Sequence, residues 1–197
     1  NPDVRNVKGE TPLYSACGYL YLRGIKLLLE AGANPNIKTK KREGSATPLH
    51  VVNMGGLVGA TEALIKAGAN VNSRDNDNLT PLHAAVQAQE YQCVKVMVDA
   101  GADPNIPTKE LGYTALLVAC QYNSLKIFRL LLQAGANPEV QLSDLRTTPL
   151  DIACVYNKKA MVKYLLIYGA RTLGPIPNAK RRNCQKHIQK YIRELDT

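Results

Sequence analysis

The sequence predicts an all-α solenoid in which short helix-turn-helix units stack side by side and β-hairpin loops project from the stack. Two observations predict this fold. A phrase beginning Thr-Pro-Leu recurs along the chain at spacings of 33 to 36 residues, and a second phrase built on Ala-Gly-Ala keeps step with it. Two phrases that share one period of this length indicate internal structural repeats.

The first phrase predicts five helix starts. Its copies begin at Thr11, Thr47, Thr80, Thr114 and Thr148. A proline follows the threonine in four copies, and proline suits the first helical position because the N–H that it lacks would be unpaired there. The threonine side chain can accept a hydrogen bond from an amide of the first turn. We therefore expect a short helix after each threonine.

The second phrase predicts the end of a longer helix. Apolar runs precede it, and its glycines occupy the position where helices end in a left-handed residue, at Gly32, Gly68, Gly101, Gly135 and Gly169. Each unit then reads helix, turn, helix and projecting hairpin. One such unit cannot bury its apolar face alone, so the copies must stack around a continuous core.

Thr-Pro-Leu-His at this period resembles the signature of the ankyrin repeat. The resemblance covers residues 1–172, as a partial repeat end at 1–8 followed by five repeats. It implies an ankyrin-repeat solenoid that acts as a non-catalytic protein–protein interaction module, a scaffold or adaptor. Residues 1–6 align with 34–39, in the middle of a repeat ending. We therefore expect the chain to be a fragment of a longer protein.

Residues 173–197 depart from the repeat pattern. A Gly-Pro-Ile-Pro break is followed by apolar residues at helical spacing, Ile188, Tyr191, Ile192 and Leu195. Terminal repeats need a cover for their exposed apolar side. We predict a linker and a C-terminal capping helix here, and the alternative is a docking motif such as the ligase-recruiting box that follows some ankyrin arrays.

The sequence offers no catalytic or metal-binding motif in the repeats. Its cysteines, Cys17, Cys93, Cys120, Cys154 and Cys184, form no Cys-x-x-Cys pair and are expected to be small core residues with free thiols. His50 and His83 fall in the repeat signature and are expected to be structural. We expect no enzyme, no cofactor and no metal, and an intracellular protein of the cytoplasm or the nucleus.

The turn between the two helices is expected to vary among repeats. The family prefers glycine there, and this chain has Leu20, Gly56, Gln89, Asn123 and Asn157. Asparagine tolerates a left-handed conformation, whereas leucine and glutamine do so poorly. The sequence therefore predicts rebuilt turns in the first and third repeats.

The resemblance also implies a binding surface, a concave groove formed by the ends of the first helices and the hairpins. Aromatic and methionine side chains are favoured at interface hot spots, and several fall at these positions. The residues predicted to bind a partner are Tyr19, Met54, Gln87, Leu111, Tyr113, Gln121, Tyr122, Leu145 and Tyr156. We therefore predict a Tyr-rich groove that binds another protein or peptide.

Net charge supplies a second hypothesis. The chain carries +9, and the hairpin of the second repeat holds a basic finger of Lys38, Lys40, Lys41 and Arg42. With the basic C-terminal segment, the finger could bind an acidic or phosphorylated ligand, such as a phosphoprotein, a phosphoinositide or a nucleic acid. No aromatic-interleaved motif favours nucleic acid, and a membrane would be reached only indirectly or through anionic lipid. A third hypothesis is the substrate-recognition subunit of a ubiquitin ligase.

Overall fold

The computed structural model describes residues 1–39, 45–143 and 147–171, together with residues 186, 188, 189 and 193. The described part of residues 1–171 contains ten α-helices, and the described residues contain no strand. The first helices of the five repeats are α1 (Pro12–Gly18), α3 (Pro48–Met54), α5 (Pro81–Gln87), α7 (Ala115–Gln121) and α9 (Pro149–Val155). The second helices are α2 (Leu22–Glu30), α4 (Val58–Lys66), α6 (Tyr91–Asp99), α8 (Leu125–Gln133) and α10 (Lys159–Ile167).

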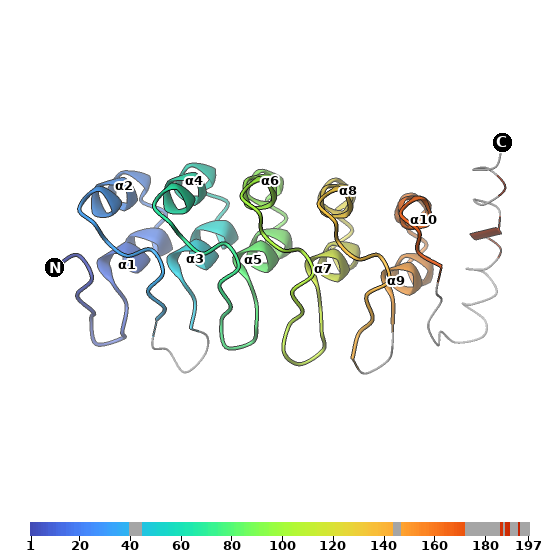
Figure 1. The fold of residues 1–197 in the computed structure, drawn as a ribbon, viewed down its shortest axis with the longest axis horizontal. Helices are drawn as coiled ribbons and strands as arrows, with labels where there is room; N and C mark the ends of the chain where they lie inside the picture. The colour runs from blue at the N-terminus through green and yellow to red at the C-terminus, as the bar shows by residue number, and fades with distance from the viewer. Residues whose placement is uncertain (40–44, 144–146, 172–185, 187, 190–192, 194–197) are drawn as a thin grey trace.

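The helices form two rows. Figure 1 shows the first helices in one row, the second helices in a parallel row, and the hairpin loops on the side away from the second row. The leucine two residues after each repeat threonine is almost fully buried, at Leu13, Leu49, Leu82, Leu116 and Leu150. Burial of one such side chain stabilises the fold by about 1.5–3 kcal/mol. The core is therefore one continuous apolar layer between the rows.

Histidine ties the second repeat to the third. The backbone N–H of Thr47 donates to Nδ1 of His50 over 3.2 Å, and Nε2 of His50 lies 3.0 Å from the carbonyl oxygen of Leu79. Because an amide can only donate and a carbonyl can only accept, Nδ1 must be unprotonated and Nε2 must carry the proton. The neutral imidazole therefore bridges a helix start to the next hairpin.

His83 makes the same bridge from the third repeat to the fourth. Thr80 N–H donates to its Nδ1 over 3.2 Å, and its Nε2 lies 3.1 Å from the carbonyl oxygen of Tyr113. Burial lowers the pKa of His83 from 6.5 to about 4, and burial also lowers the pKa of His50. Both histidines are structural, as the sequence predicted.

The fourth and fifth repeats replace this histidine differently. In the fifth repeat the buried carboxylate of Asp151 accepts from the N–H and the hydroxyl of Thr148, both over 2.8 Å. In the fourth repeat Leu117 takes the position. The buried Thr114 hydroxyl then has no hydrogen-bond partner among the described residues. Leucine therefore leaves the threonine hydroxyl without the hydrogen bond that histidine or aspartate makes in the second, third and fifth repeats.

The predicted rebuilding of two turns was wrong. Leu20 and Gln89 have φ angles of 52° and 59°, beside 59° for Asn123 and 54° for Asn157. All four turns thus keep the left-handed conformation, although it costs a leucine about 1 kcal/mol or more. The stacking of the two helices fixes the turn, and the local preference of the residue does not override it.

The projecting loops are hairpins without strand pairing in the described residues. The base of each is closed by a backbone hydrogen bond of 2.9–3.1 Å, such as Asp75 N–H to the Leu79 carbonyl and Thr108 N–H to the Tyr113 carbonyl. Asparagine side chains at the base of the loops accept backbone N–H groups of the next repeat. These bonds are Asn36 to Asn70 at 2.7 Å, Asn72 to Asp103 at 2.8 Å and Asn105 to Asn137 at 2.7 Å.

Cysteine chemistry differs from the expectation at one position. Cys17, Cys93 and Cys120 are buried free thiols, and burial raises the pKa of Cys17 and of Cys120 to about 12. Cys154 is half-buried and disulfide-bonded, so the prediction of a free core thiol was wrong there. Three of the cysteines therefore behave as small apolar core groups and Cys154 does not, while Cys184 lies outside the described residues.

Most of the predicted capping helix lies outside the described residues. The described residues Lys186, Ile188, Gln189 and Arg193 are helical. Ile188 is half-buried and packs against the core of the array. This contact is of the kind that a capping helix requires, and the role of residues 173–197 as a whole stays a prediction.

The lowered pKa of His83 predicts a loss of stability in weak acid. The unfolded histidine binds a proton near pH 6.5, whereas the folded one stays neutral to about pH 4. Stability is therefore complete above pH 6.5 and is lost as the pH falls toward 4, by about 3 kcal/mol for this residue. Urea unfolding at pH 7.5 and 4.5 should show a smaller loss for His83→Gln than for wild type. Equal losses in the two proteins would contradict the assignment.

The unpaired hydroxyl of Thr114 predicts unequal effects of one substitution at two equivalent threonines. Thr114→Val removes a buried group without a partner and should change the free energy of unfolding by less than ~0.5 kcal/mol or increase it. Thr80→Val removes the cap bonded to His83 and should cost ~1–2 kcal/mol. Chemical denaturation of both variants checks this difference. A larger loss for Thr114→Val would show that its hydroxyl is satisfied.

The left-handed turns predict opposite effects for two exchanges between glutamine and asparagine. Gln89→Asn should stabilise the protein by ~0.5–1 kcal/mol, because asparagine tolerates positive φ better than glutamine does. Asn123→Gln should destabilise it by a similar amount. Thermal unfolding of the two single variants and of the double variant tests both signs, and two changes of the same sign would refute the shared turn geometry.

Candidate partner-binding surface

Three tyrosines directly follow first helices at the same repeat position. Tyr19 follows α1, Tyr122 follows α7 and Tyr156 follows α9, each as the C-terminal cap residue. Their exposed fractions are 86%, 45% and 66%. The repeat geometry thus exposes three aromatic side chains to solvent at equivalent positions in the first, fourth and fifth repeats.

The other predicted residues differ in exposure. Met54 at the end of α3 is 63% exposed and Leu111 in the fourth hairpin is 41% exposed. Gln121 is exposed, and Gln87 is half-buried. Tyr113 is half-buried and packs against the core, so only part of its ring faces solvent. Leu145 lies outside the described residues.

Leu20 also contributes to this surface, although the amino-acid sequence did not predict a binding role for this residue. Its side chain lies over Gly55, where an added Cβ would come within 2.4 Å of a Leu20 methyl carbon. Leu20 is 40% exposed. Tyr19, Leu20 and Met54 therefore form an apolar end on the first two repeats. The available signal was an apolar residue at a position that normally holds glycine.

A second apolar end, formed by Tyr122 and Tyr156, lies on the last two repeats. The ammonium of Lys158 lies 5.3 Å from the ring centroid of Tyr156. The same ammonium donates to the backbone carbonyls of Cys120 and Gln121 at the end of α7. Lys158 therefore links Tyr156 to the fourth repeat and satisfies two backbone carbonyls at the end of α7.

The two apolar ends are not continuous. Gly55 and Ala88 occupy the tyrosine position in the second and third repeats. The middle of the surface therefore has no exposed tyrosine at this position, and Gln87 there is half-buried. The residues predicted to form the groove thus fall into two groups, one at each end of the array.

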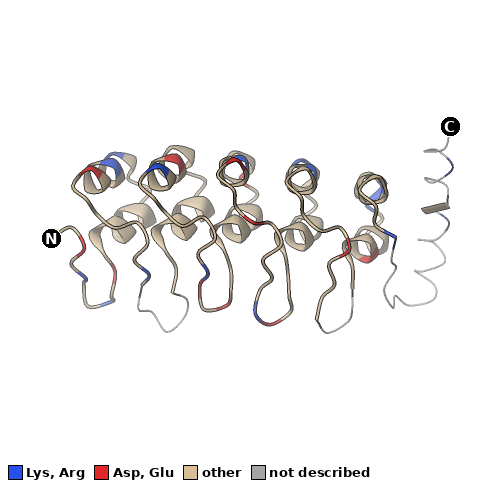
Figure 2. Ribbon diagram, viewed as in Figure 1, with Lys and Arg blue, Asp and Glu red and all other residues tan. Residues whose placement is uncertain are grey.

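Charge is nearly absent from the first helices. Figure 2 shows Lys, Arg, Asp and Glu on the second helices and on the hairpins, whereas the first row is almost uncharged. Asp151 is the one charged residue in the five first helices, and it is buried. A partner that lies along this row meets apolar and amide groups.

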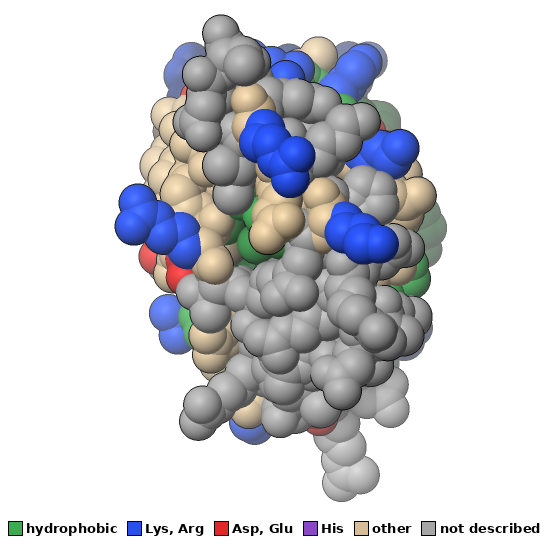
Figure 3. Space-filling view, turned by 90° about the vertical axis from the view of Figure 1, so that its right-hand side faces the viewer, with side chains coloured by type: hydrophobic (Ala, Val, Ile, Leu, Met, Phe, Trp, Pro, Cys, Tyr) green, Lys and Arg blue, Asp and Glu red, His purple; other side chains and the backbone are tan. Residues whose placement is uncertain are grey.

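The basic finger is described only in part. Lys38 is exposed, and its ammonium donates to the backbone carbonyl of Arg74 over 2.7 Å. Lys40, Lys41 and Arg42 lie outside the described residues. Seen from the C-terminal end, basic side chains of described residues stand out at several separate points, and acidic ones are few (Figure 3). The described side chains on this one face therefore show scattered positive charge.

The described residues contain neither a membrane-spanning helix nor a metal-binding cluster. No helix there is both long and apolar enough to cross a membrane. No group of three or more histidine, cysteine, aspartate or glutamate side chains there could hold a metal ion.

Sequence comparison identifies the repeats directly. The family described as ankyrin repeats in three copies matches residues 38–108 and 106–173, and the single ankyrin repeat matches residues 8–40. The chain therefore forms a repeat domain of the class that mediates protein–protein interactions. It belongs to the ankyrin repeat family.

Known proteins of several kinds contain similar segments. The chain is 32% identical over 125 residues to the ANK repeat-containing protein nipk-1 of Caenorhabditis elegans, covering 57% of this chain and 20% of that protein. It is 34% identical over 115 residues to human ankyrin repeat and SOCS box protein 16, covering 58% and 24%. The chain thus spans a quarter or less of these two relatives.

A solved structure confirms the fold. The crystal structure of the ankyrin repeat domain of Bcl-3, described as a unique member of the IkappaB protein family, superposes with a TM-score of 0.78. The two chains are 28% identical, and the match covers 87% of this chain and 75% of that one. The fold predicted from the repeat period is therefore shown.

Proposed function

We propose that the chain binds a partner protein or peptide along the row of first-helix ends, as a non-catalytic scaffold or adaptor. The observation that carries the proposal is the exposure of Tyr19, Tyr122 and Tyr156 at one repeat position beside an uncharged helix row. Aromatic side chains dominate the binding energy of protein interfaces. Leaving three of them in water at equivalent positions favours their burial by a partner.

The placement of the tyrosines indicates the kind of partner that the surface binds. An extended segment can place apolar side chains at each aromatic end while its backbone crosses the second and third repeats, which have Gly55 and Ala88 at the tyrosine position. Tyrosine offers an apolar ring and a polar tip, so it can contact both the side chains and the backbone of such a segment. The partner is expected in the cytoplasm or the nucleus.

A second candidate function uses the basic finger. Lys38 is exposed and the chain carries +9, which favours an acidic or phosphorylated ligand. A role as the substrate-recognition subunit of a ubiquitin ligase is compatible with either surface, and the similarity to the human SOCS box protein motivates it. We favour the aromatic surface, because the Lys38 ammonium already has a backbone partner in Arg74.

Replacing the three surface tyrosines should abolish partner capture. The chain and its Tyr19/Tyr122/Tyr156 triple-alanine variant are used to capture proteins from a cell lysate at low and moderate salt, followed by mass spectrometry. A partner of the aromatic surface is retained by wild type at moderate salt and lost by the variant. For that partner, Tyr122→Ala alone should weaken binding by ~2 kcal/mol, about 30-fold.

The matched control is Tyr168→Ala. Tyr168 is also a helix-cap tyrosine and is 40% exposed, but it follows the second helix α10. It should leave both binding and thermal stability unchanged. Retention that depends on low salt and is indifferent to the tyrosines would refute the proposal and assign binding to the basic residues.

A further inference from the structure

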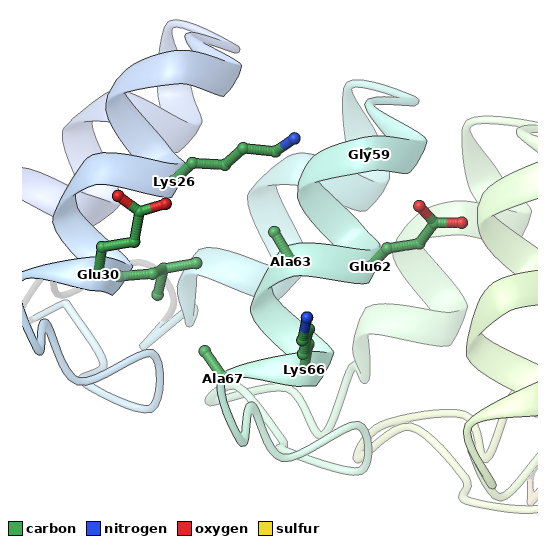
Figure 4. Close-up of a pocket in the computed structure, with 8 residues that line it drawn as sticks. Lys26, Glu30, Gly59, Glu62, Ala63, Lys66 and Ala67 are labelled. Atoms are coloured by element: carbon green, nitrogen blue, oxygen red, sulfur yellow. The ribbon is translucent and has the colours of Figure 1, made fainter.

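A groove separates the second helices α2 and α4, away from the partner-binding surface. It has a volume of about 440 Å³ and is lined by Lys26, Leu29, Glu30, Gly59, Glu62, Ala63, Lys66 and Ala67. Figure 4 shows Lys26 extending from α2 toward α4, while Ala63 presents only a methyl group toward α2. The volume lies within the range of pockets that bind small molecules.

The groove exists because two residues of α4 are small. Gly59 and Ala63 are four residues apart and therefore lie on one face of the helix. At the position of Ala63 the other second helices carry Leu27, Val96, Leu130 and Tyr164. At the position of Gly59 they carry Arg23, Gln92, Lys126 and Ala160. The second repeat alone combines two truncated side chains here.

The last two repeats show how the chain itself fills the equivalent space. The guanidinium carbon of Arg129 in α8 lies 4.8 Å from the ring centroid of Tyr164 in α10. This distance is that of a cation–π contact. Lys26 holds the position of Arg129 in its helix, and Ala63 holds the position of Tyr164. Between α2 and α4 the cation is thus present and the ring is missing.

The charges around the groove suit a neutral ring. The lining includes Lys26 and Glu30 of α2 and Glu62 and Lys66 of α4, so it carries two charges of each sign. Within the described part of the chain, Lys26 has no ion-pair partner. A charged guest would meet a like charge at close range, whereas a neutral aromatic ring would meet a free cation and apolar walls.

We propose that the groove between α2 and α4 accepts an aromatic side chain of a partner protein, with the Lys26 ammonium over its ring. The guest ring takes the place that Tyr164 occupies between α8 and α10. This site is independent of the first-helix surface, so one chain can hold two points on a partner. Either site can fail its test without affecting the other.

The direct test is an NMR titration with N-acetyl-tryptophanamide. We expect shifts at the Ala63 and Ala67 methyl groups with millimolar affinity, and the same shifts in the Tyr19/Tyr122/Tyr156 triple-alanine variant. N-acetyl-cyclohexylalaninamide, which is apolar but has no π system, should bind about two- to fivefold more weakly. Absence of shifts at Ala63, or equal affinity for the two probes, would overturn the proposal.

Two variants separate the parts of the site. Ala63→Tyr supplies the missing ring from the chain itself and should abolish probe binding, while Val96→Tyr places the same residue on the next helix and should not. Lys26→Met keeps the aliphatic stem and removes the charge, so it should remove the preference for the aromatic probe. Thermal unfolding confirms that each variant is folded. Unchanged probe preference in Lys26→Met would exclude the lysine contact.

Discussion

The structure depends on burial of apolar surface between neighbouring repeats. A pair of helices of seven and nine residues has no interior of its own, and residues such as Leu49, Leu82 and Leu116 are buried only because the next repeat covers them. This dependence fixes the spacing and orientation of the units. Side chains at one repeat position therefore line up along the array, and the surface tyrosines are aligned for this reason.

The polar contacts of the repeats differ, although the stacking of the helices is the same. Histidine, aspartate and leucine occupy one position in different repeats, and the first two satisfy the capping threonine while the leucine does not. Leu20 and Gln89 likewise adopt left-handed turns that their side chains disfavour. The stacked helices tolerate each of these unfavourable contributions, which is ~1 kcal/mol of folding free energy, because burial between repeats contributes several times more.

Sequence periodicity predicted the helices well because helix starts and ends depend on local chemistry. Threonine followed by proline marked the start of four first helices, and the glycines followed the second helices as expected. The turns at Leu20 and Gln89 were mispredicted because tertiary packing sets their geometry. The groove beside Ala63 depends on residues distant in sequence, which periodicity does not relate, and the disulfide bond of Cys154 leaves no sign in the repeat pattern.

The first-helix row and the second-helix row present different chemistry. One is uncharged and aromatic, and the other is charged and carries the groove between α2 and α4 (Figure 2). The central claim is that the partner lies along the first row. Photocrosslinking with benzoyl-phenylalanine at position 122, compared with the exposed second-helix position 126, tests it most directly. The account predicts crosslinks to a partner from position 122 and none from position 126, and equal yields from the two positions would contradict it.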